Sequence, residues 1–150
     1  MDFGVTIGET ATFSKTVGES DVYLFAGITG DLFPNHVNED FMKKRGFGRR
    51  IAHGALILAY SSTTSSMISA RSLDKSDQLF PVSLGYDHVR FLKPVFLGDT
   101  VTVRYTVETL DSERRRSTAR IEAVNQDNEL VMVAQHIMKW VEKREGQIGG

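Results

Sequence analysis

The chain has 150 residues, 41% of them hydrophobic, and a formal net charge of −1 from 18 basic and 19 acidic side chains. This length and composition match one domain with a real hydrophobic core, so we predict a single domain over residues 1–150. Because the opposite charges are mixed along the chain, there is no electrostatic case for binding nucleic acid or a membrane surface.

The sequence has no cysteine, which excludes a disulfide framework and a thiolate metal site. Its histidines are scattered without a partner at ligand spacing, so no metal site is predicted. The N-terminus lacks the basic and then apolar pattern of a signal peptide, and the longest apolar stretch, residues 55–60, is far shorter than the roughly 20 residues of a membrane span. We therefore expect a soluble, cytoplasmic protein.

Short elements are expected first along the chain. A strand is predicted near 10–17, and Ser20 is the expected N-cap of a short helix that carries Val22, Leu24, Phe25 and Ile28. A second short helix is predicted over 38–44, where acidic residues come first and basic residues last. The segment from 55 to about 69 then has the length and composition of a buried central helix, and the charged residues 71–78 are expected to form a turn.

After Pro81 the polarity alternates with period two, which predicts antiparallel strands. They include residues 87–91, 101–108, 119–123 and 130–141, with turn-rich breaks at 111–113 and 126–128. A long apolar helix followed by long antiparallel strands predicts an α+β fold in which a curved sheet wraps around a central helix. The tail from about residue 142 is expected to be flexible.

One segment carries a carboxylate and an imidazole, Asp31 and His36, five positions apart. Gly30 loosens the backbone before the aspartate, whereas Pro34 fixes φ and is expected to bar a regular helix up to His36. An irregular turn of this kind can aim both side chains at one point. Such an acid/base pair is suited to proton transfer.

Three segments together resemble the MaoC-like dehydratases, whose members include (R)-specific enoyl-CoA hydratases. They are residues 30–36 (GDLFPNH), 51–56 (IAHGAL) and 91–101 (FLKPVFLGDTV). The resemblance implies the hotdog fold and the hydration of 2-enoyl thioesters or dehydration of 3-hydroxyacyl thioesters, with an (R)-3-hydroxyacyl product. It also implies a homodimer or larger homo-oligomer with the site at the subunit interface. Coenzyme A would belong to the acyl-CoA substrate, and no other cofactor is expected.

The resemblance also assigns residues. Asp31 and His36 match the catalytic pair of the family, and Gly54 matches the glycine whose backbone N–H faces the thioester carbonyl. Which member of the pair takes the proton from water stays open. Ser62, eight positions after Gly54, is expected on the same face of the helix and matches a serine that often lines the substrate pocket of the family.

Phe33 departs from the family pattern, because an asparagine is common at this position. An apolar ring there replaces a group that donates and accepts hydrogen bonds, which predicts a slower enzyme, another substrate or no activity. Asn35 is not expected to substitute, since its side chain should point elsewhere. Phe33 itself is a possible pocket-lining residue.

Several other side chains allow two readings. His53 can line the pocket as a second acid/base group, or it can cap the central helix or fill a steric slot. Ser62 can contact the substrate or bond back to its own helix. The run of arginines at 114–116 can be a solvated turn or a contact to the phosphates of coenzyme A. His88 and His136 are expected in strands as structural residues.

The favoured function is a hydratase/dehydratase, and two alternatives remain. One is a hotdog acyl-CoA thioesterase, against which the Asp31 to His36 segment argues. The other is a non-catalytic acyl-CoA-binding subunit of a larger complex, for which Phe33 is the main support.

Overall fold

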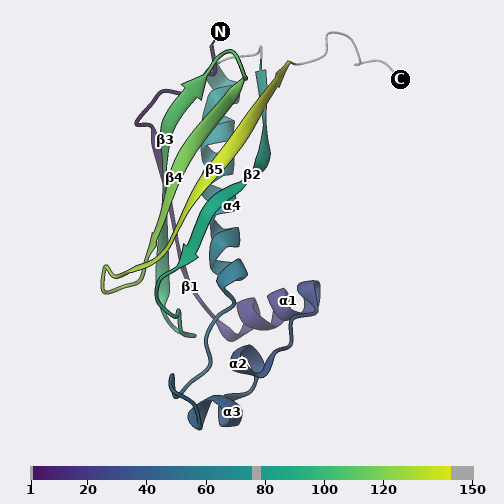
Figure 1. The fold of residues 1–150 in the computed structure, drawn as a ribbon, viewed down its shortest axis with the longest axis vertical. Coiled ribbons are helices and arrows are strands. Elements are labelled where there is room, and N and C mark those ends of the chain that lie inside the picture. The colour runs from purple at the N-terminus through teal and green to yellow at the C-terminus, as the bar shows by residue number, and fades with distance from the viewer. Residues whose placement is uncertain (1, 76–78, 143–150) are drawn as a thin grey trace.

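A curved antiparallel sheet wraps around one long helix, as predicted (Figure 1). The computed structural model describes residues 2–75 and 79–142. Its elements are β1 (Thr10–Thr16), α1 (Glu19–Thr29), α2 (Pro34–Val37), α3 (Glu39–Lys43), α4 (Gly54–Lys75), β2 (Leu79–Phe91), β3 (Thr100–Asp111), β4 (Arg116–Val124) and β5 (Leu130–Glu142). Among the described helices, none has both the length and the apolar character that crossing a membrane requires.

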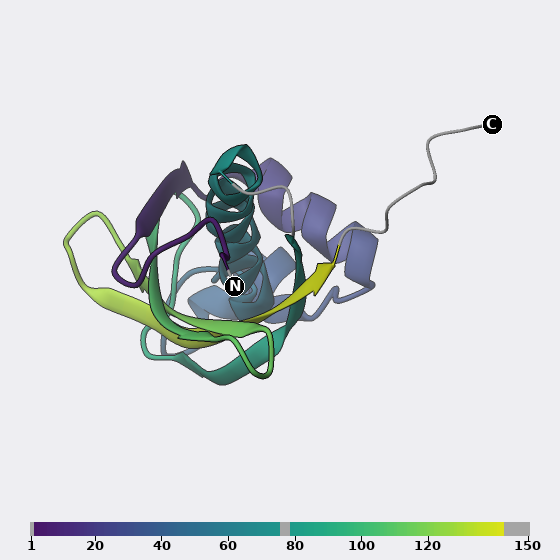
Figure 2. The same ribbon diagram turned by 90° about the horizontal axis from the view of Figure 1, so that it is seen from above.

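The five strands lie in the order β1-β3-β4-β5-β2, and each pair of neighbours is antiparallel. Seen from above, the sheet curves around α4 (Figure 2). The inward-facing side chains alternate along β3, β4 and β5 and form the core with one face of α4. Its largest fully buried side chains include Trp140, Tyr105, Ile121 and Ile68. The chain therefore has one core, and β1 and β2 form the two edges of the sheet.

The central helix α4 is longer than predicted. It begins at Gly54 and continues to Lys75, so the prediction of a turn over the first part of 71–78 is wrong. The last turn of α4 is held by the N-terminal segment, because the buried Ser72 hydroxyl donates to the Phe3 carbonyl at 3.0 Å and Arg71 donates to the Thr10 carbonyl at 2.8 Å. Residues 76–78, and the tail beyond 142, lie outside the described residues.

Two of the three short helices, α1 and α2, differ from the predictions at their first residues. The N-cap of α1 is Gly18 rather than Ser20, and its N–H donates to the carboxylate of Asp21 at 2.8 Å. Pro34 starts α2 instead of barring a helix, so His36 lies on a helical turn. A proline fits this first position because the N–H it lacks would have no partner within the helix. The third helix, α3, agrees with the prediction, and the Asn38 side chain caps it.

Arg50 ties the short helices together just before α4. Its guanidinium pairs with Glu19 on α1 and, at 3.1 Å, with Glu39 on α3. The three short helices consequently lie beside the N-terminal end of α4, at one end of the sheet (Figure 1). Residues that are far apart in the sequence meet at this junction.

Candidate functional site

Three polar side chains meet where the short helices contact the start of α4. Asp31 lies between α1 and α2, His36 lies on α2, and His53 directly precedes α4. The Oδ2 atom of Asp31 is 4.0 Å from Nε2 of both histidines. The two imidazole rings stack with their centroids 3.7 Å apart. The structure therefore brings Asp31 and His36 together, as predicted from their spacing.

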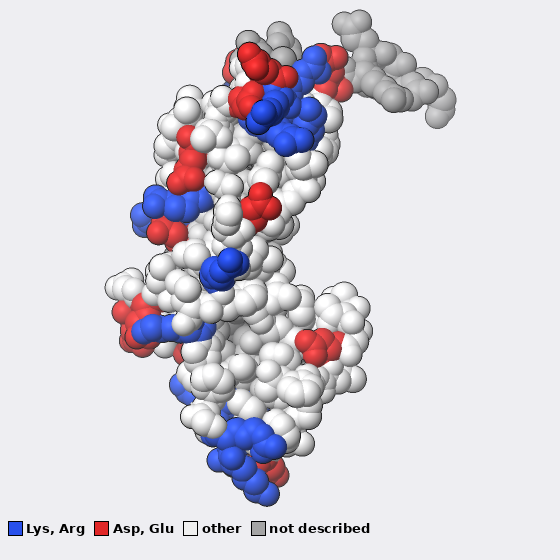
Figure 3. Space-filling view, viewed as in Figure 1, with Lys and Arg blue, Asp and Glu red and all other residues white. Residues whose placement is uncertain are grey.

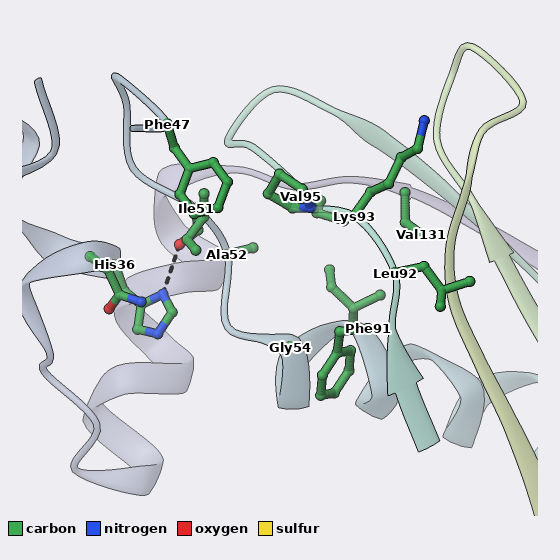
Figure 4. A pocket seen from close by; sticks show the side chains of 13 residues that line it. His36, Phe47, Ile51, Ala52, Gly54, Phe91, Leu92, Lys93, Val95 and Val131 are labelled. Carbon is green, nitrogen blue, oxygen red and sulfur yellow. Dashed lines mark hydrogen bonds between the residues drawn. The ribbon is translucent and has the colours of Figure 1, made fainter. Parts of the chain in front are cut away.

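His36 is buried, with 8% of its surface exposed, and its ring is oriented by one hydrogen bond. Its Nδ1 lies 2.8 Å from the carbonyl oxygen of Ile51 (Figure 4). Because a carbonyl can only accept, Nδ1 carries the hydrogen and Nε2 presents its lone pair toward Asp31. Burial lowers the pKa of His36, and this effect outweighs the hydrogen bond to Ile51, which raises it. A neutral imidazole with a free lone pair can act as a base.

Asp31 is exposed, and its carboxylate is held by the backbone at position 33. Its Oδ1 accepts a hydrogen bond from the Phe33 N–H at 3.2 Å. The ring of Phe33 is 61% exposed and lines a different, apolar cavity of about 510 Å³, together with Phe41, Met42 and Phe47. The contact that orients Asp31 is thus a main-chain contact, which any residue except proline can provide at this position.

A cavity of about 410 Å³ opens beside His36. Phe91, Leu92, Lys93 and Val95 approach it from one side and Phe47 and Ile51 from the other (Figure 4). Sequence reasoning missed most of these residues as lining residues, because they come from segments that only the fold brings together. Asn35 also lines the cavity. Its Oδ1 atom is buried without a hydrogen-bond partner in the described part of the chain.

Gly54 lines the same cavity as the first residue of α4. Its N–H forms no hydrogen bond with any described residue, so it is free to bind an oxygen atom. The N-terminus of a helix carries partial positive charge, which strengthens such a contact. The ring of Phe91 packs against the α-carbon, and a β-carbon at position 54 would lie only 2.8 Å from that ring. Glycine therefore allows the close contact with Phe91.

Ser62 does not share this cavity. It lines a separate one together with Ser65, Ser66, Ser69 and Ser83. The expectation that it lies on the same helix face as Gly54 is wrong, because eight residues carry a helix about 80° past two full turns. Ser65 and Ser69 bond back to carbonyls of α4. A contact between Ser62 and a substrate stays a prediction.

His53 lies behind the ring of His36. Its carbonyl accepts hydrogen bonds from the N–H groups of Leu56 and Ile57, so its backbone starts α4. Its side chain turns toward Asp31, where Nε2 lies 3.0 Å from the carbonyl oxygen. His53 therefore caps the start of α4 through its backbone carbonyl, and its buried side chain fills the space beside His36.

The side chains of Asp31, His36 and His53 also lie close enough to be considered for a metal ion, with ligand atoms within 4.8 Å of one another. However, the Asp31 carbonyl can only accept, so Nε2 of His53 carries a hydrogen and cannot bind a metal as it is placed. The cluster fits a metal ion poorly, because binding one would break this hydrogen bond.

The remaining predicted residues lie elsewhere. His136 is buried on β5 between the Ser83 hydroxyl at 2.8 Å and the Tyr105 hydroxyl at 3.0 Å, and burial lowers its pKa to about 4. His88 lies on β2 at an irregularity of the pairing with β5. The arginines at 114–116 lie at the turn between β3 and β4, at the opposite end of the molecule from α3 (Figure 1). On the face drawn in Figure 3, that end carries Lys and Arg side chains next to Asp and Glu side chains. This position favours the solvated turn over a contact near the cavity.

The chain is similar to known proteins over most of its length. Residues 2–130 match the family model of the MaoC like domain. An (R)-specific enoyl-CoA hydratase of Rhodospirillum rubrum is 39% identical over 113 residues, which are 75% of this chain and 73% of that protein. A 3-hydroxybutyryl-CoA dehydratase of Methylorubrum extorquens is 34% identical over 140 residues, 93% of this chain and 83% of that protein.

A solved structure shows the same architecture. The structure of an (R)-hydratase from A. caviae matches this chain with a TM-score of 0.77 and 27% sequence identity, covering 90% of this chain and 96% of the other. The predicted hotdog fold is confirmed by this likeness and by the sheet that wraps around α4.

The burial of His36 yields a prediction about its titration. Because desolvation disfavours the charged imidazolium, the pKa of His36 should lie below its usual value of 6.5 and the ring should be neutral at pH 7. An NMR titration of the imidazole carbon-bound protons measures this directly, with the His36→Gln variant assigning the signals. A pKa above 6.5 would contradict the interpretation of the site.

Proposed function

Because the chain belongs to the MaoC-like domain family, we propose that it is a hydro-lyase that acts on 2-enoyl-CoA and 3-hydroxyacyl-CoA thioesters. In the forward direction it adds water to the double bond and forms the (R)-3-hydroxyacyl product. The observation that carries this proposal is that His36 lies 4.0 Å from the Asp31 carboxylate and lines one cavity with Gly54, whose N–H has no partner among the described residues. Asp31 and His36 can accept a proton from water, and the Gly54 N–H can stabilise the negative oxygen of the enolate.

The thioester carbonyl is placed at the start of α4. There its oxygen accepts a hydrogen bond from the Gly54 N–H, and this bond strengthens as negative charge develops on the oxygen in the enolate. The 22-residue helix behind this N–H adds the positive end of its dipole. One such donor typically stabilises a transition state by ~3 kcal/mol.

The gap between Asp31 and His36 is suited to one water molecule. A separation of 4.0 Å between Oδ2 and Nε2 is too long for a direct hydrogen bond. A water placed about 2.8 Å from each atom can donate one hydrogen to the carboxylate and one to the imidazole. Its oxygen lone pair is then free to attack the β-carbon of the enoyl group.

The reaction transfers two protons: one leaves the water, and one is added to the α-carbon. As the oxygen bonds to the β-carbon, one acceptor of the pair takes a proton, and a proton is delivered to the α-carbon to complete the product. Dehydration follows the same steps in reverse. The two acceptors share the task, and their division of roles stays open. No change of oxidation state occurs overall, so the proposal includes no redox cofactor, and coenzyme A enters only as part of the substrate.

We also propose a homodimer. The edge strand β2 and the residues directly after it expose large apolar side chains, namely Phe80, Val82, Leu84, Phe91 and Leu92. An exposed, apolar sheet edge is a liability unless another chain covers it. Since Phe91 and Leu92 also line the cavity, a second copy on this edge would lie beside the site. Sedimentation equilibrium tests this, and a monomer at all concentrations would overturn it.

Incubation of the protein with crotonyl-CoA tests the reaction, by following both the loss of the conjugated double bond and the release of free thiol. We expect double-bond loss without thiol release. Asp31→Asn and His36→Ala should each lower turnover by at least about a hundredfold, because each removes a proton acceptor from the water. Asp40→Asn makes the same chemical change at an exposed position of α3 and serves as the matched control.

Other outcomes have clear meanings. Thiol release would identify a thioesterase, and inactivity on short and long enoyl-CoAs alike would favour a binding subunit. Rates close to wild type in either variant would remove that residue from the mechanism.

Phe33→Asn tests whether the unusual ring impairs the site. Because the backbone N–H at this position orients Asp31 while the ring lines the other cavity, we expect kcat to change by less than about threefold. Asn35→Leu should lower kcat/KM more strongly, since Asn35 borders the cavity of His36. Steady-state kinetics on crotonyl-CoA measures both. A large gain in rate on Phe33→Asn would show that the ring does impair the site.

A further inference from the structure

His53 is the most deeply buried member of the polar cluster and has no role in the steps above. Only 2% of its surface is exposed. Its ring lies between the stacked ring of His36, at 3.7 Å between centroids, and the ring of Phe25, at 4.9 Å. It contacts both members of the proposed catalytic pair but is not among the residues that line the cavity beside His36.

The hydrogen-bond partners of His53 fix which of its ring nitrogens donates. The carbonyl oxygen of Asp31 can only accept, so Nε2 carries the hydrogen that forms the bond of 3.0 Å. The other nitrogen, Nδ1, then bears a lone pair, and it is buried without a partner among the described residues. His53 therefore donates from Nε2, the nitrogen nearest the Asp31 carboxylate, and is badly placed to be a second base for the water.

The segment that carries Asp31 has few other anchors. Its remaining hydrogen bonds are local. The Asp31 N–H donates to the Thr29 hydroxyl, the Leu32 N–H to the Gly30 carbonyl, and the Phe33 N–H to the Asp31 carboxylate. The Gly30 N–H donates to the Ala26 carbonyl, and the Phe33 carbonyl accepts from the His36 N–H at 3.0 Å. Within the described chain, the bond to His53 is the hydrogen bond that ties residues 30–33 to the start of α4. Without it the turn would keep its backbone bond to His36 but lose its hydrogen bond to the start of α4 and to the ring that stacks on His36.

We propose that His53 is a positioning residue, which sets the gap between Asp31 and His36 by bonding to the backbone of one and stacking on the ring of the other. The proposal rests on the proposed hydratase function. It assigns His53 no contact with the substrate. Because small errors in the placement of reacting groups can lower a rate about a hundredfold, removing this link should impair turnover more than binding.

Three substitutions separate the two contacts. His53→Phe keeps an aromatic ring for the stack and removes the donor, His53→Gln keeps a donor and removes the ring, and His53→Ala removes both. We expect kcat for crotonyl-CoA hydration to fall about tenfold to a hundredfold in His53→Phe, with KM changed by less than about threefold. His53→Gln should recover part of the loss, and His53→Ala should be the slowest.

His136→Phe is the matched control, because it makes the same change at another fully buried histidine that lies away from the cavity. Once folded, it should keep the kcat of the wild type. A similar loss of kcat in His136→Phe would mean that general loosening of the core, and not the link to Asp31, explains the effect.

Amide hydrogen exchange and NMR test the same proposal without activity. The N–H groups of Leu32 and Phe33 should exchange at least about tenfold faster in His53→Phe than in the wild type, and the ¹⁵N signals of wild-type His53 should show hydrogen on Nε2. Unchanged exchange, or hydrogen on Nδ1, would overturn the proposal. If the wild type hydrated no enoyl thioester while the exchange and tautomer results held, the proposed function would fall and the positioning role would stand. If His53→Phe does not fold, His53→Gln and the wild-type tautomer decide.

Discussion

The start of α4 is the constraint on which the whole site depends. The helix is held inside the curved sheet along most of its length, so its first residue has a fixed position and direction. Gly54, the first residue, presents its free N–H at the cavity, and His53 directly before it turns toward Asp31 and His36. The two ion pairs of Arg50, with Glu19 and Glu39, hold α1 and α3 beside the start of α4. The core of the protein thus positions groups that lie on short, exposed segments.

The relation between the two cavities follows from this junction. Asn35, Phe47 and Ile51 border both the cavity beside His36 and the apolar cavity beyond it. Phe33 belongs to the second cavity, although its backbone holds Asp31. Replacing the usual asparagine with phenylalanine is therefore compatible with an intact acid/base pair. The change alters the surface next to the site rather than the contacts within it.

Alternating polarity predicted β3, β4 and β5, because alternation reports directly on which side of a sheet is buried. It predicted only residues 87–91 of β2, which begins at Leu79, because burial does not alternate regularly along this edge strand. Local polarity could not predict the end of α4, since charged and polar residues there bond to the N-terminal segment, which is far away in the sequence. The spacing of Asp31 and His36 predicted their convergence, but the helical turn that begins at Pro34 was missed, because proline is also accepted at the first position of a helix. Ser62 was expected on the helix face of Gly54, but the rotation of about 100° per residue places it on a different face.

The structure of a substrate complex tests the central claim most directly. Asp31→Asn should slow turnover enough to trap crotonyl-CoA in a crystal. We predict the thioester oxygen about 2.9 Å from the Gly54 N atom, and the β-carbon of the enoyl group facing the gap between residue 31 and His36. A carbonyl bound away from the start of α4, or an enoyl group directed away from His36, would contradict the proposed site.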